Sequence, residues 1–301
     1  MSIRVDRPRS TEEALELLRD ATEHTRVLAG GTDLMVELRT GRTRPDRVID
    51  LWHLHAHRDK ASKPPPIACA LAEYPDRDGK GIRIGALTTC SFLLAPFLER
   101  RADILVAAAR EVGAVQIRNR ATVGGNLATA SPAADLTPAL VALGAFVRVR
   151  SAKAHRDLWI EDFLCGYRKT LRRPDELIEC VYVPWRPPSE KRAFRKLGTR
   201  KAQAISKVVV ALAVDRDPAS RKVTALRCAA GAVAERTVAL PTLQRELVGR
   251  VPDAGLIDHA TRLAALHDVR PIDDVRSSAE YRRTTLQRML ASAMRDLLLP
   301  F

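Results

Sequence analysis

The spacing of apolar residues over the first fifty positions predicts a small α/β subdomain. Leu15 and Leu18 share one helical face, and Ser10 and Glu13 before them have the spacing of a capping box. A short apolar run then leads into a Gly-Gly pair, which is followed by a second helical segment. The predicted order is helix 10–21, strand 26–29, helix 32–41 and strand 47–51.

Farther along the chain, alternating apolar residues predict strands separated by helices. Ile82 and Ile84 point to the same face of the segment "GIRIGALTT", as in a strand. The polar stretch 53–80 contains three consecutive prolines and is predicted to be a surface loop. The remaining elements predicted up to residue 184 are a strand at 81–89, helices near 91–100 and 101–112, and strands at 146–151 and 176–184.

A proline-rich segment, "WRPPSEKR", separates two regions with different patterns. Residues 1–184 are predicted to form one domain with subdomains of about 1–55 and 56–184, and residues 185–301 a second domain. In the second region strands precede helices, which is typical of an α+β module. Its predicted strands are 193–199, 208–214 and 224–233, and its predicted helices lie near 241–249, 255–266 and 278–298.

Composition adds a charge asymmetry to this picture. The 301 residues carry a net charge of +14, and residues 181–301 alone hold 22 Lys and Arg against 12 Asp and Glu, a balance of +10. An anionic ligand or an acidic partner is therefore expected. No basic stripe with interleaved aromatic residues is present, so a nucleic-acid-binding function is not predicted. The chain has no long uncharged apolar run and no signal-type N-terminus, so we expect a cytoplasmic protein without a transmembrane segment.

Cysteine and histidine spacing gives no metal or catalytic motif. The five cysteines are scattered and odd in number, which argues against a disulfide framework or a ligated iron–sulfur cluster in this chain. His53, His55 and His57 alternate and could share one strand face as metal ligands. They begin the polar loop, however, and no metal site is predicted. No nucleophile-elbow motif is present, and no catalytic residue is predicted.

Two Gly-Gly turns are the main candidates for ligand binding: "AGGTDL" at 29–34 and "TVGGNLATASPAAD" at 122–135. Glycine lets backbone N–H groups approach a ligand closely, and Thr and Asn side chains add donors. The first turn precedes a predicted helix N-terminus, which favours anions. Together the two turns could hold the two phosphates of one pyrophosphate. Neither has the spacing of a dinucleotide fingerprint or a P-loop, so ordinary tight turns remain the alternative.

Four blocks in order, "VLAGGTDLMVELRTG", "GIRIGALTT", "QIRNRATVGGNLATASPAADLTPALVALGA" and "PIDDVRSSAEYRR", resemble the FAD-binding subunits of molybdenum hydroxylases. That group includes the medium subunit of carbon monoxide dehydrogenase and the flavin domain of xanthine dehydrogenase. The resemblance extends from about residue 3 to residue 298. It implies an α+β fold in which two α/β subdomains clasp FAD, as in vanillyl-alcohol-oxidase flavoproteins, followed by a C-terminal α+β domain.

The resemblance also implies which residues bind FAD. The first turn would line the ADP and pyrophosphate, with hydrogen bonds from its glycines and threonine; its residues are Val27, Leu28, Ala29, Gly30, Gly31, Thr32, Asp33 and Leu34. The second pyrophosphate turn would consist of Thr122, Gly124, Gly125 and Asn126.

For the flavin, ribityl and adenine parts, the resemblance implies six further residues. Ala128 and Thr129 would lie near the flavin or ribityl chain, and Asp135 would bond a cofactor hydroxyl. The other three are Leu177 and Ile178 beside the adenine, and Lys196 near the pyrimidine end of the flavin, where its charge would stabilise the reduced anion.

The resemblance implies an electron-transfer function in a complex. A large subunit with molybdopterin-bound molybdenum would oxidise the substrate, and a small [2Fe–2S] subunit would pass electrons to the FAD, within a dimer of heterotrimers. Electrons would leave to NAD, a quinone, oxygen or a carrier. Two alternatives remain open: a self-sufficient flavoenzyme resembling UDP-N-acetylenolpyruvoylglucosamine reductase, and a non-enzymatic module whose basic C-terminal half binds a polyanion.

Overall fold

The N-terminal subdomain is built on a parallel sheet. The computed structural model describes residues 3–55, 67–68, 71–76 and 79–299. Helix α1 (Thr11–Leu18) begins where the sequence predicts, because the Ser10 hydroxyl accepts from the Glu13 N–H at 3.1 Å and the Glu13 carboxylate accepts from the Arg9 N–H. Strands β1 (Arg4–Asp6), β2 (Thr25–Leu28) and β3 (Arg47–Asp50) pair in the order β1-β3-β2, with α1 (Thr11–Leu18) and α2 (Leu34–Arg39) as the connecting helices.

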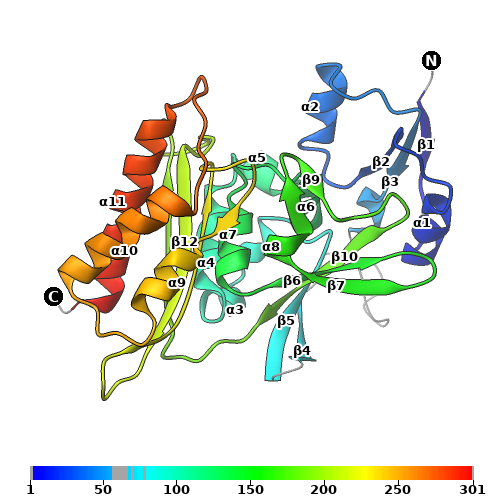
Figure 1. Cartoon of the computed structure of the whole chain (residues 1–301). Helices are drawn as coiled ribbons and strands as arrows, with labels where there is room; N and C mark the ends of the chain where they lie inside the picture. Colours follow the sequence, from blue (N-terminus) through cyan, green and yellow to red (C-terminus); the bar gives the residue numbers. More distant parts are fainter. Residues whose placement is uncertain (1–2, 56–66, 69–70, 77–78, 300–301) are drawn as a thin grey trace.

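A five-stranded antiparallel sheet forms the centre of the molecule (Figure 1). Its middle strand, β10 (Leu177–Pro184), is buried at every position, and apart from Glu179 its residues are apolar or proline. The order is β4-β5-β10-β6-β7, made of β4 (Leu71–Asp76), β5 (Gly79–Gly85), β10 (Leu177–Pro184), β6 (Phe146–Arg150) and β7 (His155–Trp159).

The predicted surface loop over 53–80 is wrong in part. Residues 71–76 form the edge strand β4, and η1 (Trp52–Leu54) is a single 3₁₀ turn. An edge strand tolerates charged residues and proline, so its sequence lacks the apolar alternation on which the prediction relied. Residues 56–66, 69–70 and 77–78 of the predicted loop lie outside the described residues.

Short helices and a small hairpin connect the central strands. The two predicted helices over 91–112 are observed as three shorter elements, and the second glycine turn opens α6. The helices are η2 (Phe92–Leu94), α3 (Pro96–Glu99), α4 (Asp103–Glu111), α5 (Val115–Arg118), α6 (Val123–Thr129), α7 (Leu136–Ala142) and α8 (Ile160–Phe163), and the hairpin strands are β8 (Leu164–Gly166) and β9 (Lys169–Thr170).

The C-terminal sheet is covered by helices on both faces. In β12 (Val208–Arg216), Val208, Val210 and Leu212 belong to the core with the three C-terminal helices, whereas Ala211 belongs to the central core with α4 and α7. The small alanine allows α7 to pack closely on this face. The sheet order is β11 (Lys191–Leu197), β12 (Val208–Arg216), β13 (Val223–Gly231) and β14 (Val238–Ala239), and the helices are α9 (Pro241–Leu247), α10 (Ala254–His267) and α11 (Ala279–Leu298).

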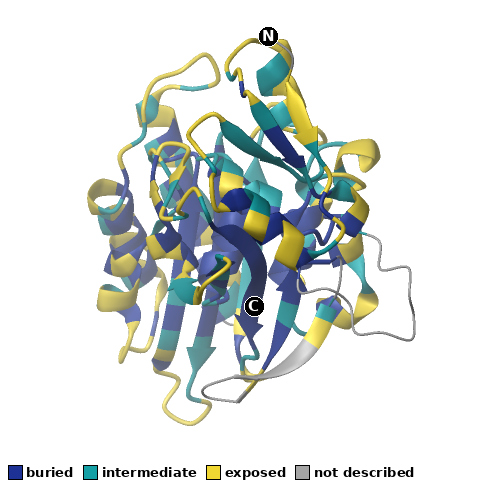
Figure 2. Cartoon of the chain, turned by 90° about the vertical axis from the view of Figure 1, so that its right-hand side faces the viewer, coloured by how far each residue is buried: buried dark blue, intermediate teal, exposed yellow. Residues whose placement is uncertain are grey.

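These layers confirm the predicted α+β class. Figure 1 shows the N-terminal subdomain at one end of the molecule and α10 and α11 at the other, with the central sheet and α4, α6 and α7 between them. Figure 2 shows that buried residues fill these inner layers, while exposed residues lie along the loops and outer helix faces. Among the described helices, none combines the length and apolar character required to cross a bilayer.

A buried arginine on α11 joins the C-terminal helices to the sheet. Arg282 is 4% exposed and donates to the carbonyl oxygens of Lys207 and Ala232 at 2.9 and 2.8 Å and to the Asp274 carboxylate at 2.7 Å. A guanidinium can serve several acceptors at once because its five N–H donors are held in a rigid plane. Arg282 therefore has a structural role in the "YRR" segment.

We expect Arg282→Met to lower the free energy of unfolding by about 3 kcal/mol, because it leaves two carbonyls and a carboxylate without their donor. Urea denaturation monitored by circular dichroism measures the change. The control is Arg288→Met on the exposed face of the same helix, expected within about 0.5 kcal/mol of the parent. Equal unfolding free energies for the two variants would contradict the assigned role.

Candidate functional site

The two glycine turns touch each other in the folded chain. A Cβ built on Gly30 would overlap the carbonyl oxygen of Arg120, which is close to the start of the second turn. The Arg120 Nε also donates to the Gly30 carbonyl oxygen at 3.2 Å. The two segments are ninety residues apart in sequence, and only a residue without a side chain at position 30 lets their backbones meet.

The first turn presents a run of unsatisfied backbone donors. In the part of the chain that the structure describes, the N–H groups of residues 30–33 have no hydrogen-bond acceptor. Gly31 has φ of +79°, a left-handed conformation that favours glycine and turns the backbone into α2. Consecutive free N–H groups at the start of a helix form a concave anion site. Thr32, half-buried beside them, adds a hydroxyl.

The second turn, in contrast, uses most of its backbone donors within the protein. The N–H groups of Val123 and Gly124 donate to the carbonyls of Thr88 and Ala86 at 2.9 and 2.8 Å. The Thr122 hydroxyl caps α6 by accepting from the Gly125 N–H at 3.0 Å. A Cβ on Gly124 would lie 2.8 Å from the Ala86 Cβ, so the requirement for glycine there comes from packing against β5 and its following turn.

Side chains at the end of α6 remain available to a ligand. The Asn126 Oδ1 is buried without a hydrogen-bond partner among the described residues, which is costly unless a donor is supplied. Ala128 is exposed and Thr129 half-buried on the last turn of the same helix. The part of the second turn that can contact a ligand is therefore displaced from its glycines toward Asn126, Ala128 and Thr129.

Charged residues bridge the first turn, α6 and the β8–β9 hairpin. Desolvation raises the pKa of the Asp33 carboxyl, the nearby Arg168 opposes the rise, Glu37 adds to it, and a hydrogen bond from Thr129 lowers it. Arg168 lies at the hairpin tip and donates to the Glu37 carboxylate. Asp33 begins α2 but makes no capping hydrogen bond. Its carboxylate instead takes part in this cross-element network.

Asp135 and Lys196 are brought together as a buried ion pair. The Lys196 Nζ donates to the Asp135 Oδ2 at 2.7 Å and to the Glu111 carbonyl oxygen at 3.0 Å, and the Ser206 hydroxyl donates to the Asp135 Oδ1 at 2.7 Å. The Lys196 side chain is 5% exposed. Burial raises the pKa of the Asp135 carboxyl, and Lys196 and Ser206 oppose the rise. The pair joins the start of α7 to β11.

The predicted apolar residues lie in two separate cores. Leu177 packs in the N-terminal cluster, whereas Ile178 belongs to the central cluster; they are 4% and 8% exposed. Little of either side chain is therefore accessible for contact with a ligand. The remaining residues of the first turn are half-buried, in or beside β2 and at the start of α2: Val27, Leu28, Ala29 and Leu34.

Neither His53 nor His55 lies on a strand. His53 lies in the η1 turn, where its ring contacts the Pro8 carbonyl, and the His55 ring stacks on Trp52 at 4.5 Å between centroids. His57 lies outside the described residues. Within the described residues no three His, Cys, Asp or Glu side chains gather as a metal site.

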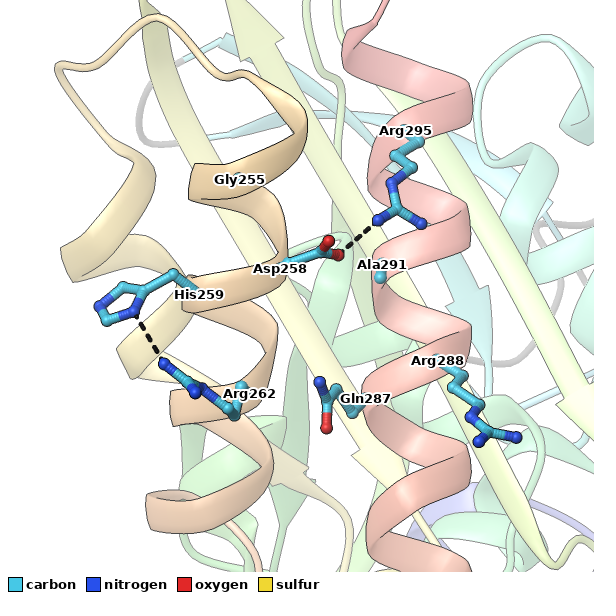
Figure 3. A pocket seen from close by; sticks show the side chains of 8 residues that line it. All are labelled: Gly255, Asp258, His259, Arg262, Gln287, Arg288, Ala291 and Arg295. Atoms are coloured by element: carbon cyan, nitrogen blue, oxygen red, sulfur yellow. Dashed lines mark hydrogen bonds and ion pairs between the residues drawn. The ribbon is translucent and has the colours of Figure 1, made fainter.

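A hollow lies between α10 and α11 (Figure 3). It has a volume of about 540 Å³ and is lined by Arg262, Arg288 and Arg295 among others. The Arg295 guanidinium is bonded to Asp258, and Arg288 points away from the facing helix. These arginines do not converge on one point, so the groove has no assembled ligand site.

Sequence reasoning missed Arg120, Arg168 and Ser206. Arg120 stacks on Trp52 at 3.6 Å, and Ser206 completes the bonding of Asp135. Arg168 has φ of +53°, unusual for a residue with a side chain. In the sequence these residues resemble ordinary polar surface positions, and no short-range pattern identifies the groups they contact.

Comparison with known proteins covers almost the whole chain. The family described as "FAD binding domain in molybdopterin dehydrogenase" matches residues 1–186, and "CO dehydrogenase flavoprotein C-terminal domain" matches residues 192–297. The nicotinate dehydrogenase FAD-subunit of Eubacterium barkeri is 31% identical over 297 residues, covering 97% of this chain and 94% of the relative. The carbon monoxide dehydrogenase medium chain of Afipia carboxidovorans is 28% identical, covering 96% and 94%.

Solved structures share the fold. The structure of reconstituted CO dehydrogenase from Oligotropha carboxidovorans superposes with a TM-score of 0.86 at 26% identity, covering 98% of this chain and 97% of that one. The similarity therefore includes the N-terminal subdomain, the central sheet and the C-terminal helices.

Lys196→Met should destabilise the chain by about 3–5 kcal/mol at neutral pH, because it leaves the Asp135 carboxylate buried without its cation. Loss of Lys196 raises the folded-state pKa of Asp135 further above the unfolded value of about 3.9. A raised pKa means that stability falls as pH rises from about 4 to the folded pKa, so the deficit should be larger at pH 8 than at pH 5.

Urea denaturation at several pH values measures the effect of Lys196→Met. The double variant Asp135→Asn with Lys196→Met is the control; it removes both charges and should recover part of the stability and lose the pH dependence. A deficit independent of pH in Lys196→Met would contradict the ion-pair assignment.

Proposed function

The chain belongs to the FAD-binding subunits of the molybdenum hydroxylase family, and we propose that it passes electrons from a [2Fe–2S] partner through bound FAD to an external acceptor. Membership in the family confirms the resemblance seen in the sequence. The bound FAD supplies the redox chemistry. The residues of this chain bind and orient it, and no catalytic residue is proposed.

The observation that supports FAD binding most directly is the run of free N–H groups at residues 30–33 beside α6. A pyrophosphate requires several donors close together, and these four N–H groups are consecutive in a turn where Gly31 adopts a left-handed conformation. Backbone donors cannot be lost by a change of rotamer, so the surface is organised before the ligand arrives. We assign the ADP and pyrophosphate to the segment Val27–Leu34.

The second segment is assigned to the ribityl chain and flavin. The unpartnered Asn126 Oδ1 would accept from a ligand hydroxyl or N–H, and exposed Ala128 leaves space for a ring or chain beside α6. Asp135 retains lone pairs beyond its bonds to Lys196 and Ser206. It is therefore proposed to accept from a cofactor hydroxyl, with Lys196 providing positive charge near the flavin.

Packing within the protein restricts two of the proposed roles. Thr122, Gly124 and Gly125 are engaged in capping and packing, so their proposed contribution to the pyrophosphate turn is to shape it. Leu177 and Ile178 are nearly covered, and their proposed contact with the adenine is limited to their edges.

The proposed partners are a large molybdopterin subunit that oxidises the substrate and a small [2Fe–2S] subunit, assembled in the cytoplasm as a dimer of heterotrimers. The names of two relatives, a "FAD-subunit" and a "medium chain", support a multi-subunit assembly. The +10 balance of residues 181–301 suits an acidic partner surface. The final acceptor is proposed to be NAD, a quinone, oxygen or a carrier.

Ala128→Trp should sharply reduce retained flavin while the protein stays folded, because the bulky ring would fill the space beside α6 without disturbing a buried contact. The flavin released by denaturation is identified and counted by chromatography, and the parent should release FAD and no FMN. Ala254→Trp, at an exposed alanine that begins α10, is the matched control with full retention. Full FAD occupancy in Ala128→Trp would refute the placement of the flavin near α6.

The isolated chain should bind FAD but leave the organic substrate unchanged until both partner subunits are added. The test is reconstitution from separately purified subunits whose metals have been analysed. Encounter with an acidic partner should slow as salt rises, since exposed charges are screened over about 8–10 Å at 0.1–0.15 M salt. Substrate-dependent flavin reduction by this chain alone, free of molybdenum and iron, would overturn the proposal in favour of a self-sufficient flavoenzyme.

A further inference from the structure

Two carboxylates lie beside the proposed pyrophosphate site. Asp33 ends the run of free N–H groups, and Glu37 follows one helical turn later on α2. Both carboxylates lie next to the segment proposed to receive a pyrophosphate, which carries two negative charges. Like charges a few ångströms apart repel, and the repulsion increases where the surroundings exclude water. An anion site flanked in this way needs a cation close to both carboxylates.

Arg168 contacts both carboxylates. Its Nη1 donates to the Glu37 Oε1, and its Nη2 lies 4.0 Å from the Asp33 Oδ1. The guanidinium reaches them from the tip of the β8–β9 hairpin, more than 130 residues away in sequence. Its side chain is one-third exposed, which leaves donors available to a ligand.

Arg120, which also contacts this turn, is committed elsewhere. Arg120 donates to the Gly30 carbonyl and its guanidinium lies 3.6 Å above the Trp52 ring. The left-handed φ of +53° at Arg168 costs about 1 kcal/mol or more for a residue with a side chain, so a glycine would be favoured at this turn on backbone grounds alone. A side chain held there against that preference points to a role for the guanidinium.

We propose that Arg168 is the charge-compensating residue of the FAD site: its guanidinium neutralises Asp33 and Glu37 and thereby lets the turn at 30–33 accept a pyrophosphate. The inference rests on the proposed function, because it takes FAD as the ligand. It differs from a purely structural role, in which the Arg168–Glu37 ion pair would only hold the hairpin against α2.

The structural role and the charge-compensating role predict different FAD affinities for Glu37→Gln. If the ion pair is only a structural link, Arg168→Gln and Glu37→Gln remove the same contact and should weaken FAD binding equally. If Arg168 compensates charge, Arg168→Gln weakens FAD binding about tenfold, because two uncompensated carboxylates then face the phosphates. Glu37→Gln leaves the affinity unchanged or increases it, and the double variant recovers most of the loss.

The experiment measures the dissociation constant of FAD by flavin fluorescence on the full chain after flavin removal, for each single variant, the double variant and the parent. Lys169→Gln, in the same hairpin, is the charge-matched control and should bind like the parent. Arg168→Lys should fall between the parent and Arg168→Gln, since it keeps the charge without the bidentate fork. Thermal unfolding of each apoprotein verifies that the variants are folded.

Each outcome supports or overturns the inference. Parent-like affinity in Arg168→Gln overturns the role of Arg168. So does a loss that Glu37→Gln alone reproduces and that the double variant does not rescue. In both cases FAD binding by the parent sustains the proposed function. Failure of the parent itself to bind FAD overturns both. A tenfold loss in Arg168→Gln that the second substitution restores supports charge compensation.

Discussion

The candidate site depends on one backbone contact, that of Gly30 with the Arg120 carbonyl. It brings the N-terminal subdomain into backbone contact with the segment that leads into helix α6. Any side chain at position 30 would push the two apart, because backbone cannot move aside as a flexible side chain can. The free donors at 30–33 and the unpartnered Asn126 side chain therefore belong to two segments that this contact holds together.

Buried charges join the remaining layers where apolar packing alone would not fix their orientation. The Asp135–Lys196 pair connects α7 with β11, and Arg282 connects α11 with the loops around the C-terminal sheet. Each lies where segments from different parts of the chain meet. Such pairs add little net stability over apolar replacements, but breaking one partner is costly, so they favour one arrangement over its alternatives.

Regular elements with local signals were predictable from sequence. Ser10 and Glu13 start α1 as expected, and the apolar run of β10 ends at Pro184. Elements whose stability comes from neighbours were not: β4 is an edge strand with charged residues and proline, and the β8–β9 hairpin is only a few residues long. Their patterns are indistinguishable from polar loops, because pairing with distant strands stabilises them.

For the candidate site, the sequence by itself determined that two glycine turns with Thr, Asn and Asp donors occur in a molybdenum-hydroxylase flavin subunit. It could not separate the glycines required by packing, such as Gly124, from the turn whose N–H groups remain free. It also could not pair Lys196 with Asp135 or bring Arg168 to Asp33 and Glu37. Only the tertiary structure decided these contacts, because hydrogen-bond partners and charge neighbours are set by distances in space between residues that are far apart along the chain.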